Sequence, residues 1–138
     1  MSSRRKTLYE DQYASFSVVE SIPCVKVKLS GFPTGSDHYQ YVQTKLVETI
    51  RAQATNYCRL HLLTDNTEAG VVLDEDMTYF KCNIIPAIEE AGVRYHAIVL
   101  PQNFFGKVIK SQTALVNRKL KVAYFDTVTR ASKWLKKQ

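Results

Sequence analysis

Residues 58–64 read C-R-L-H-L-L-T and residues 94–100 read R-Y-H-A-I-V-L, and these two stretches decide the fold. Each is a short, mainly apolar run of the kind found in strands that are buried on both faces of a sheet. The first run ends at Asp65 and Asn66, and the second ends at Pro101. Both are therefore predicted to be strands of a parallel sheet that helices cover.

An antiparallel hairpin is predicted ahead of these strands. Residues 13–20 form its first strand, and in residues 24–29 apolar side chains alternate with lysines, as in a strand with one face in water. Residues 21–23 are a tight connection between the two. We expect the hairpin to lie at an edge of the sheet.

Helices are predicted between the later strands, because apolar residues recur there at spacings of three and four. The first helix is predicted over 37–54, with Ser36 as its N-cap, and the second runs from Asp74 to Ala91 and is kinked or split by Pro86. A third helix is predicted over 104–119. A strand over 121–125 follows it, and the last helix is capped by Asp126 or Thr127.

The resulting order is β-β-α-β-α-β-α-β-α, which predicts a single α/β domain with a mostly parallel sheet and an antiparallel N-terminal edge hairpin. The 138 residues are too few for two typical domains. We assign residues 13–138 to this domain and residues 1–12 to a flexible basic N-terminal segment.

The net charge of +6 does not by itself indicate a nucleic-acid partner. Five of the cations are terminal, and others are expected at the C-terminal ends of helices, where positive charge is stabilised. By contrast, no Lys or Arg lies between Arg59 and Lys81, a stretch with five acids. Solvated helix ends are favoured over an anionic partner, and a nucleic acid is the least favoured.

The location is predicted to be the cytoplasm. No apolar run approaches the roughly 18–20 residues of a membrane span, and no apolar segment follows the basic start as in a signal peptide. Cys24, Cys58 and Cys82 are an odd, widely spaced set, which is typical of reduced thiols.

No catalytic residue, metal site or cofactor is predicted. Cys58 and His61 would point to opposite faces of a strand, so they are not expected to share a metal ion. Cys82 is predicted in the core, His61 and His96 as structural residues inside strands, and His38 as exposed. The loop over 31–37 lacks the lysine of a phosphate-binding loop.

Candidate binding residues lie where the parallel strands are predicted to end, because ligands of open α/β sheets gather there. These residues are Asp65, Thr67, Glu68, Asn103 and Phe104. The competing interpretation, which we favour, is that they cap helices and make turns.

The chain resembles the sulfate-transporter/anti-sigma-antagonist (STAS) group, above all its small bacterial stand-alone members of STAS/CRAL-TRIO-like type. The resemblance rests on the N-terminal hairpin, on L-L-T-D ending at Asp65, on the proline-interrupted helix closing at Ala91-Gly92-Val93, and on F-D-x-x-x-x-A-x-x-W-L from Phe125 to Leu135. It implies a protein-interaction or ligand-sensing module and not an enzyme.

The resemblance fails at the turn where anti-sigma antagonists carry a phosphorylatable serine in a D-S-x-G-type motif. Here Thr67 is the only hydroxyl of the corresponding segment, and Asp65 and Glu68 flank it. A phosphate would add roughly −1.5 to −2 charge beside these acids, which disfavours a phospho-switch.

The leading functional expectation is a non-enzymatic regulatory or protein-interaction module of STAS-like type, forming a homodimer. The alternative is a small-ligand carrier or sensor for a lipid or metabolite. Its apolar pocket would lie between the sheet and the helix that starts near Asp74, with Met77, Phe80 and Ile84 making that helix a movable lid. An enzyme would require Asp65, Glu68 and a histidine to converge.

Overall fold

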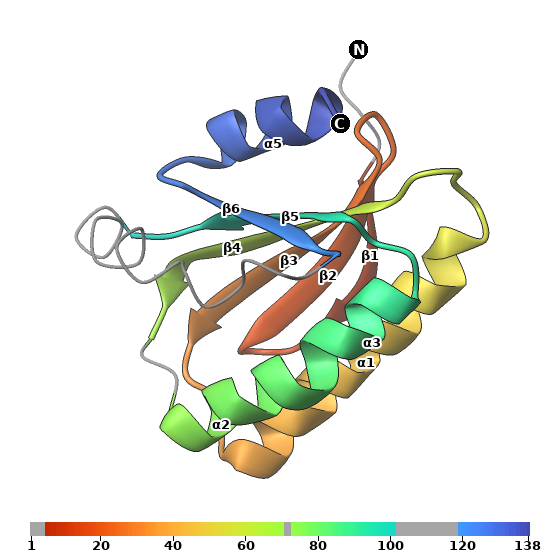
Figure 1. The fold of residues 1–138 in the computed structure, drawn as a ribbon. Helices are drawn as coiled ribbons and strands as arrows, with labels where there is room; N and C mark the ends of the chain where they lie inside the picture. The colour runs from red at the N-terminus through yellow and green to blue at the C-terminus, as the bar shows by residue number, and fades with distance from the viewer. Residues whose placement is uncertain (1–4, 71–72, 102–118) are drawn as a thin grey trace.

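The computed structural model describes residues 5–70, 73–101 and 119–138, which form one mixed sheet with helices on both faces (Figure 1). In the described residues the sheet has six strands in the order β1-β2-β3-β4-β5-β6. The strands are β1 (Arg5–Glu10), β2 (Ala14–Val19), β3 (Cys24–Gly31), β4 (His61–Ala69), β5 (Tyr95–Val99) and β6 (Lys121–Phe125). Strands β1 to β3 pair antiparallel, and β3 to β6 pair parallel. The α/β class and the mixed sheet are confirmed.

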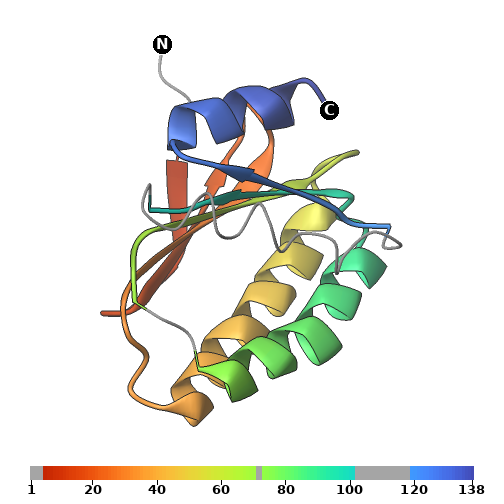
Figure 2. The ribbon, with the colours of Figure 1, turned by 60° about the vertical axis from the view of Figure 1, so that its left-hand side comes forward.

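The helices divide between the two faces of the sheet (Figures 1 and 2). On one face α1 (Ser36–Ala54) runs beside a composite helix, which consists of α2 (Asp74–Tyr79), the π-helix η1 (Phe80–Ile84) and α3 (Ile85–Glu90). Right-handed crossovers between sequential parallel strands place both on the same face. Helix α5 (Val128–Lys136) lies on the opposite face.

Each face has its own hydrophobic core. The larger core lies under α1 and α3, and its largest fully buried side chains include Phe16, Ile50, Leu62 and Ile88. The smaller core lies under α5 and includes Leu63 and Leu135. Leu62 and Leu63 are adjacent in β4 and serve opposite cores, as alternation along a strand requires. The prediction that β4 is buried on both faces is confirmed.

The N-terminal segment differs from its prediction. Residues 1–12 were expected to be flexible, but β1 occupies Arg5–Glu10 and pairs with β2. The Tyr9 ring stacks on Phe16, with 5.0 Å between the ring centroids. The antiparallel hairpin of β2 and β3 is confirmed, although β1 takes the edge position. The basic sequence did not predict this strand, because the strand is stabilised by pairing with β2 and has no apolar pattern of its own.

Strand β4 is also longer than predicted. Asp65 and Asn66 were expected to end it, yet it continues to Ala69 and pairs with β3 as far as Gly31, with one register shift after Lys28. Backbone pairing with a neighbouring parallel strand holds these polar residues in extended conformation. The extension carries β3 and β4 past the end of β5, to the start of α1 and α2.

The predicted helices are found with local differences. Helix α1 buries the predicted stripe of Tyr39, Val42, Leu46 and Ile50. Ser36 does not cap it: its hydroxyl instead donates to Glu75 Oε1 at 2.9 Å. Thr127 caps α5, since its Oγ1 accepts from the Arg130 N–H. The helix predicted over 104–119 falls, except for its last residue, outside the described residues.

The interruption predicted at Pro86 is present as the π-helix η1, after which Pro86 stands in the first turn of α3. Two side chains that were expected inside lie outside: Met77 and Cys82 are exposed. A π-helix adds a residue to the turn, so the positions that face the core shift along the helix. Ile84 and Ile88 are buried as predicted, and Ile85 is buried with them.

Candidate functional site

The predicted binding residues of β4 bond to one another or to a neighbouring strand. Asp65 is buried, and its Oδ1 accepts from the Thr67 N–H at 3.0 Å and from the Thr67 hydroxyl at 2.7 Å. Glu68 forms an exposed ion pair with Lys28 at 3.0 Å. This is the local turn-type bonding that the competing interpretation expects of Asp and Thr. Asn103 and Phe104 lie outside the described residues.

The histidines do not converge with Asp65 and Glu68. His61 precedes Asp65 by four strand residues, which separates them by about 13 Å. His96 lies on the opposite face, where its Nε2 shares a hydrogen bond with Thr64 Oγ1 at 2.8 Å. Burial lowers the pKa of His96 to about 3. Burial also lowers the pKa of His61, and the positive charge of Arg59 adds to this effect. Both rings are therefore held neutral in the sheet.

His38 is half-buried, contrary to the expectation that it is exposed. Its Nδ1 accepts from the Thr34 N–H at 3.0 Å, so its Nε2 carries the proton donated to Asp11 Oδ2 at 2.8 Å. Burial acts to raise the Asp11 pKa, but hydrogen bonds from Tyr9, His38 and two backbone amides outweigh it and lower the pKa to about 2. This network fixes the loop before α1 against the β1–β2 turn.

A cavity of about 280 Å³ lies beside this network, which we call the strand-end pocket. It occupies the carboxyl ends of β3 and β4 and the beginnings of α1 and α2, where open α/β sheets bind ligands. Its walls are the side chains of Tyr13, Phe32, Pro33, Tyr39, Leu73 and Asp76 and the backbone of Gly31, Gly35 and Gly70.

Glycines shape the mouth of the strand-end pocket. Gly31 has a φ of 70°, a left-handed conformation that turns the chain out of β3 at little cost for glycine. Its carbonyl accepts from the Gly70 N–H at 2.8 Å. The Phe32 ring lies directly on Gly70, where an added Cβ would come within 2.4 Å of a ring carbon. Phe32 can therefore lie across the end of β4 only because residue 70 has no side chain.

Asp76 is the distinctive group of the strand-end pocket. It is the one buried residue of α2 and is 2% exposed. Of the described residues, none donates a hydrogen bond to its Oδ1. Burial raises the pKa of Tyr13 to about 12, and the negative charge of Asp76 adds to this effect. Burial also raises the pKa of Tyr39, with Tyr13 and Asp76 adding to the effect. The pocket thus combines a carboxylate with two neutral phenols.

The rim of the strand-end pocket is apolar and acidic. Phe32 is 68% exposed and Leu73 is 58% exposed, and Met77 follows one turn along α2. The first turn of α2 holds three acids. The Ser36–Glu75 hydrogen bond joins the beginnings of α1 and α2 beside this rim.

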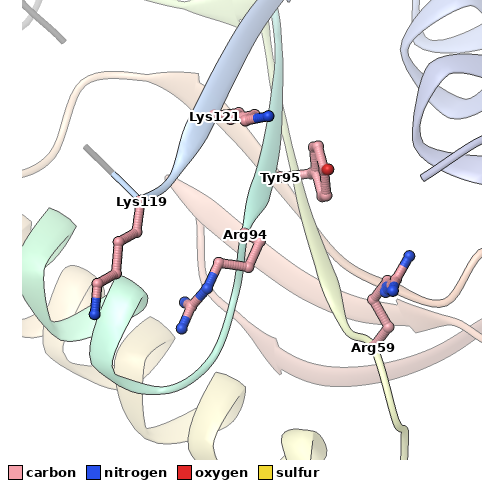
Figure 3. Close-up of a pocket in the computed structure, with 5 residues that line it drawn as sticks. All are labelled: Arg59, Arg94, Tyr95, Lys119 and Lys121. Atoms are coloured by element: carbon pink, nitrogen blue, oxygen red, sulfur yellow. The ribbon is translucent and has the colours of Figure 1, made fainter. Parts of the chain in front are cut away.

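A second hollow, the basic pocket, lies at the amino ends of the parallel strands (Figure 3). It measures about 240 Å³ and is lined by Arg59, Arg94, Tyr95, Lys119 and Lys121. These side chains do not converge: Arg94 and Lys119 extend toward α3, whereas Tyr95 and Lys121 extend toward the α5 side (Figure 3).

Three of the basic side chains already have partners. Arg94 donates to the Glu89 carbonyl at 2.8 Å, which stabilises the C-terminal end of α3, and Arg59 donates to the Gln138 carbonyl at 2.7 Å. Lys121 lies 5.9 Å from the centre of the Tyr95 ring. These contacts give the basic pocket a structural explanation, so the strand-end pocket is the stronger candidate.

Comparison with known proteins adds no assignment, since neither a family model nor a curated protein matches the chain. Within the described ranges, no group of three or more His, Cys, Asp or Glu side chains is placed to hold a metal ion. None of the described helices combines the length and apolar character needed to cross a membrane.

The sequence did not single out the key residue of the strand-end pocket. The alternative hypothesis placed a pocket between the sheet and the helix that starts near Asp74, under Met77, Phe80 and Ile84. The cavity instead lies at the beginning of that helix, and none of these three side chains lines it. Asp76 was interpreted only as part of an acidic first turn. Its spacing was informative, because it lies four residues before Phe80 and eight before Ile84, on the side of the helix that packs against the larger core.

Proposed function

We propose that this chain is a small-ligand-binding module, a carrier or sensor, whose ligand occupies the strand-end pocket. The observation that carries the proposal is an apolar cavity at the carboxyl ends of β3 and β4 that is lined by a buried acid, Asp76, whose Oδ1 has no partner among the described residues. Ligand sites are typically apolar hollows with a few well-placed polar groups.

Two further points support this proposal. The volume of about 280 Å³ is close to the lower end of ligand pockets, about 300–1,000 Å³, so the pocket suits a small molecule or one head group. The resemblance to STAS-type modules also favours ligand sensing over catalysis, although fold resemblance alone does not assign function.

A fragment screen by two-dimensional ¹H–¹⁵N NMR tests the proposal. We expect binding fragments to shift the amide signals of Gly31, Gly35 and Gly70, which line the pocket. Gly35→Leu should abolish these shifts, because a side chain added there enters open space at the pocket and the Gly35 backbone, with a φ of 165°, accepts any residue.

Ala52→Leu is the matched control, since it adds the same side chain at an exposed position near the other end of α1. It should leave the fragment shifts unchanged. If bound fragments perturb only residues outside the strand-end pocket, or if Gly35→Leu binds them as the wild type does, the proposal is wrong.

The protein-interaction hypothesis is the second candidate, and the exposed rim formed by Phe32, Leu73 and Met77 favours it. Large apolar side chains that gather on a surface are typical of interaction sites. A homodimer built on this rim should show a concentration-dependent sedimentation coefficient that Leu73→Glu reduces to the monomer value. A wild-type protein that remains monomeric at all concentrations would contradict the homodimer.

A further inference from the structure

We infer that the ligand of the strand-end pocket is a small protonated amine whose N–H donates to Asp76 Oδ1 while its apolar substituent contacts Phe32 and Leu73. This inference rests on the proposed function and specifies the chemistry of its ligand. Three features of the pocket support it, namely the carboxylate, the aromatic walls and the absence of a cation among the described lining residues.

The carboxylate of Asp76 defines what a ligand must supply. An ionised carboxylate only accepts hydrogen bonds, and Oδ1 receives none from the described residues. Burying a charged acceptor without a partner is costly, whereas a charge-assisted hydrogen bond in a water-poor site is strong. A ligand with a positively charged N–H group satisfies the oxygen and neutralises its charge at once.

The aromatic walls favour the same ligand. Tyr13, Tyr39 and Phe32 all line the cavity, and aromatic ring faces attract cations. The raised pKa values of the two tyrosines keep their hydroxyls neutral, so the phenols add no competing charge of their own. The rings also provide the apolar surface that the substituent of the amine would cover.

No described lining residue supplies a cation of its own. The part of the lining that the structure describes includes no Lys or Arg, and the chain has none between Arg59 and Lys81. The His38 and Tyr13 rings pack in a T-shaped arrangement, but His38 Nδ1 accepts a backbone N–H and its Nε2 proton is donated to Asp11. The acidic first turn of α2 further disfavours an anionic ligand.

Ring-matched probes test this inference on the intact chain. We would titrate ¹⁵N-labelled protein at pH 7 with cyclohexylammonium, cyclohexanol and cyclohexanecarboxylate, which differ mainly in charge. Cyclohexylammonium should bind about tenfold or more tightly than cyclohexanol. Cyclohexanecarboxylate should bind most weakly. Cyclohexyltrimethylammonium, which has the charge but no N–H, should bind more weakly than cyclohexylammonium, and equal binding would overturn the assigned hydrogen bond.

Asp76→Asn identifies the group responsible, and Asp74→Asn is its control. Both remove one negative charge from the same helical turn, but Asp74 is exposed. Asp76→Asn should reduce the preference for cyclohexylammonium over cyclohexanol to within about twofold, while Asp74→Asn keeps the wild-type preference. An unchanged preference in Asp76→Asn would show that another group binds the cation.

The outcomes separate this inference from the function on which it rests. If cyclohexanol or cyclohexanecarboxylate binds the pocket as tightly as cyclohexylammonium, the amine is the wrong ligand class and the pocket proposal stands. If no probe and no fragment shifts the pocket amides, the proposed function itself is wrong. The wild-type preference decides the inference even where Asp76→Asn fails to fold.

Discussion

Replacing Asp76 with asparagine should make the ligand-free protein more stable. A buried acceptor without a partner costs about 1–3 kcal/mol, and a charged one costs more. Asparagine keeps the shape of the side chain and removes the charge, although its amide brings N–H groups that also need partners. We therefore expect the free energy of unfolding to rise by about 1–2 kcal/mol, part of that penalty. This corresponds to an increase in Tm of about 3–7 °C for a chain of this size.

Urea unfolding followed by the fluorescence of Trp134 measures this change. Trp134 is the single tryptophan, and it packs against Tyr95 and Phe125 on the α5 face, away from the strand-end pocket. Asp74→Asn is again the control. It should lower the free energy of unfolding by about 0.5 kcal/mol, because acids in a first helical turn are mildly stabilising. If Asp76→Asn is as destabilising as Asp74→Asn, or more so, the carboxylate of Asp76 has a structural partner and the reasoning is refuted.

Two further predictions concern the stability of the sheet. Burial lowers the pKa of His96 to about 3, whereas an unfolded histidine titrates near 6.5. The stability that the neutral ring contributes is thus present above pH 6.5 and lost as the pH falls toward 3, by at most about 1.4 kcal/mol per pH unit. Urea titrations at several pH values should show a smaller loss for His96→Asn, and an identical loss would contradict a neutral His96. Gly31→Ala should lower the free energy of unfolding by about 1–2 kcal/mol, because an L-residue is strained at a φ of 70°. Gly35→Ala, at an extended position, should change it by less than about 0.5 kcal/mol.

The parts of the fold that the sequence predicted are those with a dense local pattern. The apolar stripe of α1 has four members at helical spacing, and the runs that became β4, β5 and β6 stand out from their polar flanks. The cap of α5 at Thr127 is also a local feature. In each case the pattern that reveals the element is formed by residues close together in the chain.

The features that the sequence missed depend on distant partners. Strand β1 exists because its backbone pairs with β2, and the last residues of β4 remain extended because β3 continues beside them. Ser36 was expected to cap its own helix, but its hydroxyl donates a hydrogen bond to Glu75 in another helix, α2. The candidate site lies elsewhere than predicted for the same reason. Asp65 and Thr67 hydrogen-bond to each other within β4, whereas the cavity is lined by Asp76, whose burial depends on how α2 packs.

The small-ligand and protein-interaction hypotheses both depend on helix α2 and the residue before it. This helix has six residues and buries only Asp76, so little apolar surface holds it to the sheet, whereas α3 is anchored by Ile85 and Ile88. A π-helix, a feature frequent at functional sites, separates the two. A cation bound between Asp76 and the rings of Tyr13 and Tyr39 would tie α2 to the rest of the fold. Because the exposed rim residues Leu73 and Met77 belong to this same segment, such a ligand would also change the surface offered to a partner, as a sensor requires.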